Sequence, residues 1–532
     1  MNRLQMLDKE KCILVSTILF VVVITLFAWQ SDDAYHAYVM AKHLVEGYGF
    51  VYNIGERATA STCPLFTLII AFGYLVFRNM YLVSLFICIL FSTLAYIVVV
   101  KCFCKTSIQV IATFFSFVFS GCFISFTTSG LENCLLFFLA ALFLKIYINK
   151  SRYNSKYLFG LAFLLSLIAM TRMDMVLAFV PAVVFAFLFK REKCSFIKAF
   201  FIGFAGLMPF VLWELFATFY YGFPFPNTYY AKLGTGISLF EYLYRGNEYY
   251  VFSFLFDPLV VLIPFIAILI AFARKNKKMI ACVLGILLYL GYLLYIGGDF
   301  MVGRLFTVVF FISIIVILWF VNDIDNKKRF TLAWASIIVV SFVFSLLFRP
   351  VVSSRMHPNG PIADERGWYM PYTGLINNAK SYISTGHMVL WDTWNNESEF
   401  YELMDSGEND RYFVSWAAGI MVYEYSDYYL NDLCALGDPF LSKLPAVWTE
   451  GWRIGHLYRD VPAGYCETVY YDQNMIQNES LSEYYEIIKL ITRGPLFSQD
   501  RIMAIFDVNT GKYDYLIDDY ASTLDENNCQ LP

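Results

Sequence analysis

Long apolar segments dominate the first 348 residues of this 532-residue chain and restrict the architecture that it can adopt. A helix that crosses a bilayer needs about 20 consecutive, mostly apolar residues, and inside lipid every backbone polar group must be satisfied by the chain itself. The candidate spans are 12–29, 81–100, 108–126, 130–149, 157–170, 175–189, 199–217, 251–273, 279–296, 304–321 and 330–348. The sequence therefore predicts a polytopic α-helical membrane protein with eleven transmembrane helices. With 59% hydrophobic and 15% charged residues, the chain is neither a soluble enzyme, a disordered protein nor a nucleic-acid-binding protein.

Charge divides the chain into two unlike parts. Residues 1–348 carry 27 Lys and Arg against 16 Asp and Glu, whereas residues 349–532 carry 12 against 27. We expect the first part to be the membrane domain and the second to be a soluble domain with its own core. The second part combines an apolar run at 412–423, an amphipathic stretch at 481–490 and a strand-like stretch at 501–508. This combination predicts a mixed α/β domain.

Basic residues in the short loops predict the orientation of the spans. Clusters of Lys and Arg precede the first span and recur at 101–105, 145–156, 190–198, 274–278 and 327–329. We assign these segments to the cytoplasm, which places the first loop (31–61) and the acidic C-terminal part outside it. The apolar segment 62–77 is short and contains Pro64 and Gly73. We interpret it as re-entrant or interfacial, because a twelfth crossing would return the C-terminal part to the cytoplasm.

The predicted outer segments hold the unusual polar residues. They include all five histidines: His36, His43, His357, His387 and His456. Directly after the first span come two adjacent acids, Asp32 and Asp33, and then a helical apolar pattern that predicts an amphipathic helix on the membrane surface. Asp33 fits the N-cap of this helix. A carboxylate at a low-dielectric boundary also suits a general base, because its pKa can be raised there.

Other outer segments carry charged and aromatic side chains that have structural as well as functional explanations. Glu132 can complete a capping box with Ser129, Arg304 can extend from the start of a span to the interface, and tyrosines are common in interfacial belts. The functional explanation is a site in which aromatic rings hold a sugar or a lipid head group and cations hold phosphate. Its candidate residues are Arg57, Glu132, Arg172, Asn227, Tyr229, Tyr230, Lys232, Asp299 and Arg304.

Taken together, these segments resemble the GT-C superfamily of membrane glycosyltransferases, and more narrowly the family that includes the mycobacterial terminal arabinofuranosyltransferase. The matching segments follow the order of that family: Asp32 to Tyr35, Gly47 to Arg57, Ser129 to Glu132, Pro226 to Lys232, Gly297 to Arg304, Ala435 to Pro439, Trp452 to His456 and Pro462 to Tyr465. Two segments depart from it. Ala60-Ser61-Thr62 replaces the usual Glu-Gly-Tyr-Thr, and Met173-Asp174 replaces the usual Pro-Glu-Gly after Thr-Arg. Arabinose is therefore not carried over as the donor sugar.

The resemblance implies a glycosyltransferase that moves a sugar from a polyprenyl-phosphate donor to a glycan, lipid or protein acceptor of the cell envelope. The reaction would take place at the outer face of the cytoplasmic membrane, with membrane lipid as the surroundings and no nucleic acid involved. Asp32 is the expected general base, and Asp33 would orient the acceptor or a divalent metal ion, although no ligand spacing requires a metal. The alternative function is a multi-span transporter or lipid flippase. Such proteins usually contain matching halves, and no internal repeat is evident here.

The charge pattern makes a prediction about topology. A single cysteine placed in the C-terminal part should react with an impermeant thiol reagent in intact spheroplasts, whereas a cysteine introduced as Asn276→Cys should react only after permeabilisation. Labelling at residue 276 without labelling in the C-terminal part would overturn the orientation.

Overall fold

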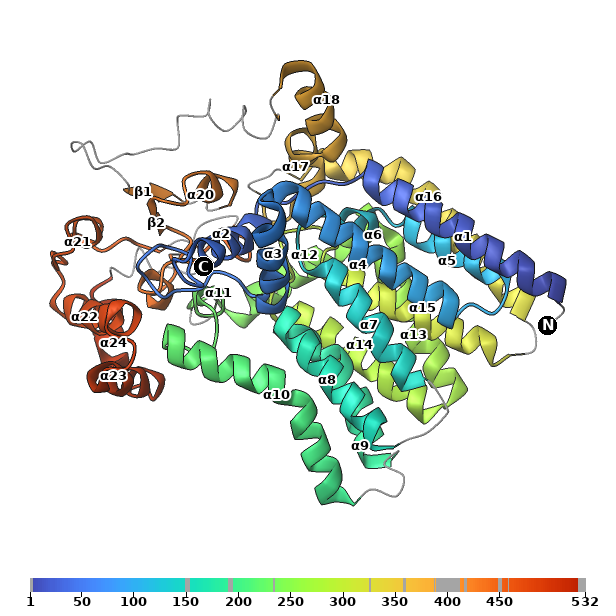
Figure 1. Cartoon of the computed structure of the whole chain (residues 1–532), viewed down its shortest axis with the longest axis horizontal. Helices are drawn as coiled ribbons and strands as arrows, with labels where there is room; N and C mark the ends of the chain where they lie inside the picture. Colours follow the sequence, from blue (N-terminus) through green and yellow to red (C-terminus); the bar gives the residue numbers. More distant parts are fainter. Residues whose placement is uncertain are drawn as a thin grey trace. The chain divides into compact units, whose positions relative to one another are not determined.

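The computed structural model describes residues 3–148, 154–189, 195–232, 235–324, 327–356, 360–386, 388, 412–415, 419–447, 452–457 and 459–524. His357 and His387 lie outside these ranges, as do parts of the basic clusters at 145–156 and 190–198. Within the described ranges the protein is mostly helical (Figure 1).

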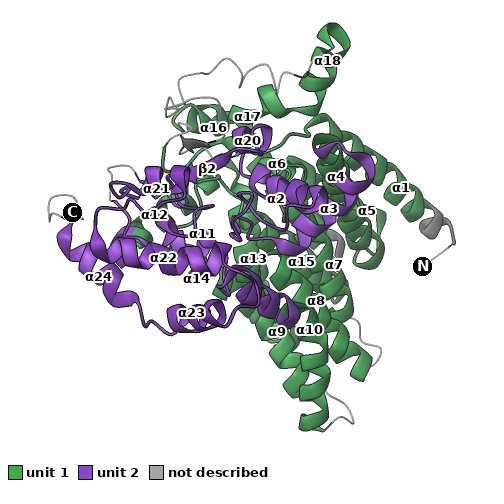
Figure 2. Cartoon of the chain, turned by 60° about the vertical axis from the view of Figure 1, so that its left-hand side comes forward, with its two compact units in different colours: residues 1–31, 81–210, 242–390 green, residues 32–80, 211–241, 391–532 purple. Residues whose placement is uncertain are grey.

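The chain divides into two compact units, each assembled from three separate segments (Figure 2). Unit 1 consists of residues 1–31, 81–210 and 242–390, and unit 2 of residues 32–80, 211–241 and 391–532. The first outer loop and the loop at 222–226, which contains Phe223 and Phe225, thus group with the C-terminal part. The division predicted from charge places both loops with the spans instead.

Unit 1 contains most of the apolar helices. Its elements are α1 (Arg3–Leu26), α4 (Met80–Cys102), α5 (Ser107–Phe119), α6 (Gly121–Ser125), α7 (Asn133–Ile148), α8 (Ser155–Thr171), η1 (Met173–Met175), α9 (Val176–Phe189), α13 (Pro258–Arg274), α14 (Lys277–Tyr295), α15 (Phe306–Asn322), α16 (Lys327–Ser353), α17 (Glu365–Thr373) and α18 (Leu375–Thr385). Two further helices, α10 (Phe196–Tyr221) and α12 (Leu239–Phe256), contribute residues to both units. Helix α15 is buried along almost its whole length and packs against α7 and α13. A helix that is apolar all round is expected in such a central position.

Four helices are long and apolar enough to cross a membrane: α4, α10, α14 and residues Arg329–Ser353 of α16. The count is five if the bent pair α12 and α13 forms one span. Six shorter apolar helices accompany them among the described residues: α3, α5, α7, α8, Met173–Phe189 and α15. The structure is thus that of a helical protein with four or five membrane-length spans, fewer than the eleven predicted. The segment 62–77 forms the 14-residue helix α3 (Pro64–Phe77), which is shorter than a full crossing.

Two predicted spans are not continuous helices. The predicted span 251–273 breaks at Asp257, where α12 and α13 meet at 107°. Pro258 has no N–H to continue a helix, and the Asp257 carboxylate accepts the Leu259 N–H at 3.1 Å as the cap of α13. The predicted span 108–126 breaks at Ser120, whose Oγ accepts the Phe123 N–H at 3.1 Å. Apolar periodicity does not detect such capping side chains.

Unit 2 combines short helices with one small sheet. Its elements are α2 (Ala34–Glu46), α3, α11 (Asn227–Lys232), β1 (Tyr412–Ser415), α20 (Ile420–Glu424), β2 (Tyr429–Asp432), η4 (Leu441–Lys443), α21 (Tyr465–Tyr471), α22 (Glu479–Arg493), α23 (Gln499–Asn509) and α24 (Asp514–Thr523). The two strands are parallel, with Tyr412 opposite Tyr429. The predicted helix after Asp33 is confirmed as α2, which ends at Gly47 with φ of 90°. The predicted amphipathic stretch 481–490 is confirmed within α22.

The prediction of a strand at 501–508 is wrong, because this segment forms helix α23. Its run of consecutive apolar residues resembles a short strand, but the cap before it determines the conformation. Ser498 Oγ accepts the Arg501 N–H at 3.3 Å, and Asp500 lies in the first turn, where a negative charge is favourable. Most of the described C-terminal part is therefore helical, and its sheet has only two strands.

Glu56 and Arg57 connect the first outer loop to the C-terminal helices of unit 2. Arg493 Nη2 donates to Glu56 Oε1 at 3.1 Å, and the Tyr429 hydroxyl donates to Glu56 Oε2 at 2.8 Å. The Arg57 guanidinium donates to the carbonyl oxygens of Ile491 and Gly494, at the C-terminal end of α22. Segments more than 430 residues apart in the sequence are thereby held together.

This buried ion pair predicts a loss of stability on mutation. Glu56→Gln leaves the largely buried Arg493 without its main counterion, so we expect the free energy of unfolding to fall by roughly 3 kcal/mol. Thermal melting of the detergent-solubilised protein measures the effect. Asp472→Asn is the matched control, because Asp472 is 71% exposed and lies 3.8 Å from the same guanidinium. Equal melting temperatures for the Glu56 and Asp472 variants would contradict the assignment.

Candidate functional site

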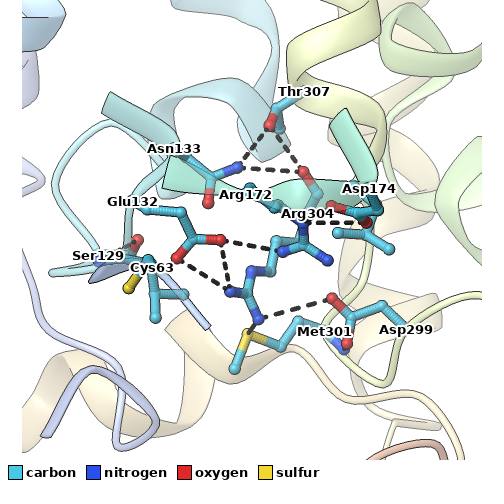
Figure 3. A network of polar contacts seen from close by, with 12 residues as sticks. Cys63, Ser129, Glu132, Asn133, Arg172, Asp174, Asp299, Met301, Arg304 and Thr307 are labelled. Atoms are coloured by element: carbon cyan, nitrogen blue, oxygen red, sulfur yellow. Dashed lines mark hydrogen bonds and ion pairs between the residues drawn. The ribbon is translucent and has the colours of Figure 1, made fainter. Parts of the chain in front are cut away.

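Five charged side chains form one network in unit 1 (Figure 3). Glu132, directly before α7, accepts hydrogen bonds from Arg172 Nη1 at 3.0 Å and from Arg304 Nη2 at 3.1 Å. Arg172 also donates from Nε to Asp174 Oδ1 at 2.8 Å. Arg304 Nη1 lies 3.7 Å from Asp299 Oδ2. The structure thus brings together four of the predicted site residues, Glu132, Arg172, Asp299 and Arg304.

The loop before α15 holds Arg304 in this network by folding around Tyr249. Gly298 has φ of 80°, and a Cβ atom there would lie 2.5 Å from the Tyr249 side chain, so only glycine fits. The Tyr249 hydroxyl accepts the Leu305 N–H at 3.0 Å. Gly298, the second of the two adjacent glycines, is therefore required for the loop to close over this ring.

The charges of the unit 1 network already balance one another. Glu132 is 2% exposed, and its carboxylate forms ion pairs with the guanidinium groups of both Arg172 and Arg304. Three carboxylates face two guanidinium groups, which leaves no net positive charge for a phosphate. Helix α7 begins at Asn133, so Glu132 does not complete a capping box with Ser129. We interpret the network as a structural link between α7, η1 and the loop before α15.

A second polar cluster surrounds Asp32 in unit 2. The Ile420 N–H donates to Asp32 Oδ1 at 2.7 Å. A Cβ atom on Gly419 would collide with the Asp32 carboxyl group, so the backbone at 419–420 closes directly over it. The residue keeps partial solvent access, but desolvation raises the pKa of Asp32 to about 6. Asp33 raises this pKa further, whereas the Ile420 N–H, His36 and Arg453 lower it.

Asp33 does not act as the side-chain cap of α2. It stands at the N-cap position with helical backbone angles, and its carboxylate makes no capping hydrogen bond. The structural explanation for this acid is therefore not realised. Both adjacent acids of the first outer loop remain candidates for chemistry.

Tyr52 and Asp432 lie on another side of the cluster. Tyr52 is buried, and its pKa is raised by burial and by the charges of Asp432 and Asp32. The His36 ring centre is 5.6 Å from that of Tyr52. Asp432, at the end of β2, accepts the N–H groups of Cys434 and Gly437 at 2.9 Å each. These bonds fix its carboxylate in place.

Cationic side chains complete the cluster in unit 2. Arg453 Nη2 lies 2.7 Å from His456 Nε2. Burial lowers the pKa of His456, and the positive charges of Arg453 and Lys232 lower it further. Lys232 is the last residue of α11, which Arg459 anchors by donating to the Ala231 carbonyl oxygen at 2.6 Å. Asp32, whose pKa is raised, thus shares unit 2 with the cations Arg453 and Lys232, and the charge of Arg453 acts on it.

The other predicted site residues have different surroundings. The Arg57 guanidinium donates to a carbonyl oxygen at the end of α22. Tyr230 packs against Phe223, and the Lys443 ammonium group lies 2.8 Å from the centre of its ring. Tyr229 is 42% exposed. Asn227 is buried, and its Nδ2 has no hydrogen-bond partner in the part of the chain that the structure describes. Among these four residues, Asn227 has the property expected of a ligand-binding group.

Sequence reasoning did not assign His36, Tyr52, Asp432, Arg453 or His456 to the site. For His36, Arg453 and His456 a signal existed, since the histidines gather on the predicted outer side and Trp452 to His456 is one of the matching segments. Tyr52 also lies in a matching segment, Gly47 to Arg57, whereas Asp432 comes from a distant segment with no chemical pattern of its own. The described residues contain no group of three or more His, Cys, Asp or Glu that could hold a metal ion.

Comparisons of the chain with protein-family models, with curated proteins and with solved structures give no match.

The structural interpretation of the unit 1 network makes a prediction. Glu132→Gln removes the carboxylate that Arg172 and Arg304 share. We therefore expect it to lower the free energy of unfolding by about 3 kcal/mol. Asp299→Asn should cost less, because its carboxylate lies at the longer distance of 3.7 Å. Thermal melting in detergent compares the two. A Glu132→Gln variant with the wild-type melting temperature but a slower reaction would instead place the network in the active site.

Proposed function

We propose that this protein is a glycosyltransferase that moves a sugar from a polyprenyl-phosphate donor to a cell-envelope acceptor at the outer face of the cytoplasmic membrane. The observation that supports it most strongly is the cluster around Asp32, which combines an acid of raised pKa with Arg453, Lys232 and two histidines. The ordered series of sequence segments, from Asp32 to Tyr465, supports the same function.

The cluster contains the groups that such a reaction requires. The acceptor hydroxyl oxygen forms a bond to the anomeric carbon of the sugar and passes its proton to the Asp32 carboxylate. The bond between that carbon and the phosphate oxygen breaks, and the phosphate leaves with the bonding electrons. Arg453 and Lys232 stabilise the negative charge that develops on it. A carboxylate with a pKa of about 6 is ionised at neutral pH and is a stronger base than an ordinary Asp.

The proposal includes the membrane topology. Eleven crossings require that shorter apolar helices such as α7, α8 and α9 cross together with the membrane-length ones. The basic segments at 101–105 and 274–278 then lie in the cytoplasm, and the soluble C-terminal part lies outside. The alternation of basic and acidic loops along the sequence supports this arrangement.

The competing function is a transporter or lipid flippase, and one observation favours it. Helices α12 and α13 are broken by 107° at Asp257, and discontinuous helices are common in transporters. The two functions are separated by giving a panel of radiolabelled polyprenyl-phosphate sugars to the purified protein, in detergent with an acceptor and, in parallel, in reconstituted vesicles. Label in an acceptor supports a transferase. Label that moves across a reconstituted bilayer without forming a product supports a transporter.

The role of Asp32 predicts separate effects on rate and stability. Asp32→Asn should reduce kcat by about 10²–10⁴-fold, because the general base is lost. The pKa of Asp32 is higher in the folded protein than in the unfolded chain. The stability that protonated Asp32 contributes is therefore lost as pH rises through about 6. At pH 7.5 the variant should therefore melt no lower than the wild type, and the wild-type kcat/KM should fall below about pH 6.

Asp33→Asn is the matched control for this prediction. It changes the adjacent acid, which has no capping hydrogen bond, and we expect a smaller loss of rate at an equal melting temperature. Near-normal turnover of both folded variants would exclude the paired acids from catalysis.

A further inference from the structure

Two arginines of unit 1, outside both clusters described above, reach neighbouring turns of α6. A Cβ atom on Gly121 would collide with the Arg349 guanidinium, and Arg366 Nη1 donates to Ser125 Oγ, four residues further along the same helix. Arg349 is in the last turns of α16 and Arg366 is in the first turn of α17, two helices that follow one another in the chain (Figure 1). The Arg349 guanidinium carbon lies 4.2 Å from the ring centre of Phe256, at the end of α12. That of Arg366 lies 4.7 Å from the ring centre of Phe27, just after α1. Aromatic faces thus hold both guanidinium groups in place.

Few of the hydrogen-bond donors of this pair are used. Arg366 Nη1 donates to Ser125 Oγ at 3.4 Å. Neither arginine forms an ion pair with an acid of the described residues. A guanidinium group carries N–H donors in a planar fork that matches the oxygens of a phosphate. The pair therefore has unused capacity to bind an anion.

The charge of Asp364 acts on Arg366 and that of Asp257 acts on Arg349, but both carboxylates are hydrogen-bonded to other donors. Asp364 accepts Ser353 Oγ at 2.8 Å and the Gly367 N–H at 3.0 Å, as the cap of α17. Asp257 accepts Ser120 Oγ at 2.6 Å and the Cys122 N–H at 2.9 Å, in addition to capping α13. Burial and the positive charge of Arg349 lower the pKa of Arg366 to about 10, whereas the negative charge of Asp364 raises it, so Arg366 stays charged at neutral pH.

The surroundings of the pair indicate the source of the anion. Arg349 is near the C-terminal end of the membrane-length segment Arg329–Ser353, where a cation lies at head-group depth. Little of this segment is buried, and Leu346, one helical turn before Arg349 on the same side of α16, is 60% exposed. An apolar surface beside two cations fits a phosphate that carries acyl chains better than a phosphate free in water.

We propose that Arg349 and Arg366 form a binding site for the phosphodiester head group of an anionic membrane lipid. The two guanidinium groups hold the phosphate oxygens, and the acyl chains lie along the exposed apolar residues of α16. Gly121 makes room for the site, because a Cβ atom there would collide with the Arg349 guanidinium. This lipid site is independent of the proposed transfer reaction and of the Asp32 cluster.

The test measures lipid bound to the full-length protein. Purified protein in detergent is titrated with dioleoylphosphatidylglycerol, and bound lipid is counted by native mass spectrometry. The wild type should retain one tightly bound molecule, and Arg349→Gln or Arg366→Gln should each weaken its binding by roughly tenfold or more. Arg355→Gln is the matched control, because Arg355 is exposed and lies between α16 and α17. It should bind the lipid like the wild type.

Two further variants keep the positive charge. Gly121→Ala displaces the Arg349 guanidinium. The double variant Arg349→Lys/Arg366→Lys keeps both charges but loses the planar arrangement of N–H donors. Both proteins should bind the lipid more weakly than the wild type. Equal lipid binding by wild type, Arg349→Gln and Arg366→Gln would overturn the proposal. So would equal binding of dioleoylphosphatidylcholine, or displacement of the lipid by an equal concentration of soluble glycerol phosphate, which would indicate a site for free phosphate.

Discussion

A charge buried next to the apolar helices of this protein is unfavourable unless it is paired or hydrogen-bonded. This constraint determines how the polar side chains are arranged. In unit 1, Glu132 lies between two guanidinium groups, and each guanidinium has a second carboxylate. Asp257 satisfies the same requirement without a cation within ion-pair distance among the described residues, by accepting a hydroxyl and two backbone N–H groups. Because these contacts join helices that are distant in the sequence, pairing charges also fixes how the helices pack.

The constraint distinguishes the two polar clusters by their chemical capacity. The network around Glu132 is neutralised internally, so it has little to offer a ligand. The cluster around Asp32 has an acid whose ionisation is unfavourable and a pair of imidazole and guanidinium groups in contact. Perturbed acids of this kind gather at functional sites. The matching segments in unit 1 and unit 2 therefore have different explanations, although the sequence presents them as one series.

Much of the helical architecture could be predicted from the sequence, because a run of apolar residues has few alternatives. Helices α4 and α14 follow the predicted spans closely. The breaks at Ser120 and Asp257 could not be predicted from apolar periodicity, since a single capping side chain determines each. In the site, Asp32 and Lys232 were predictable from local pattern. Asp432 was not, because only the fold brings β2 to the first outer loop.

The discontinuous construction of unit 2 has a consequence for biosynthesis. The backbone group that closes over Asp32 belongs to Ile420, 388 residues further along the chain. A ribosome must therefore deliver about four-fifths of the chain before this acid acquires its environment, and closing so long a loop carries an entropic cost. The nascent chain can insert its apolar helices first while the Asp32 carboxyl remains an ordinary solvated acid. Its altered basicity arises only when the segment around Ile420 has docked.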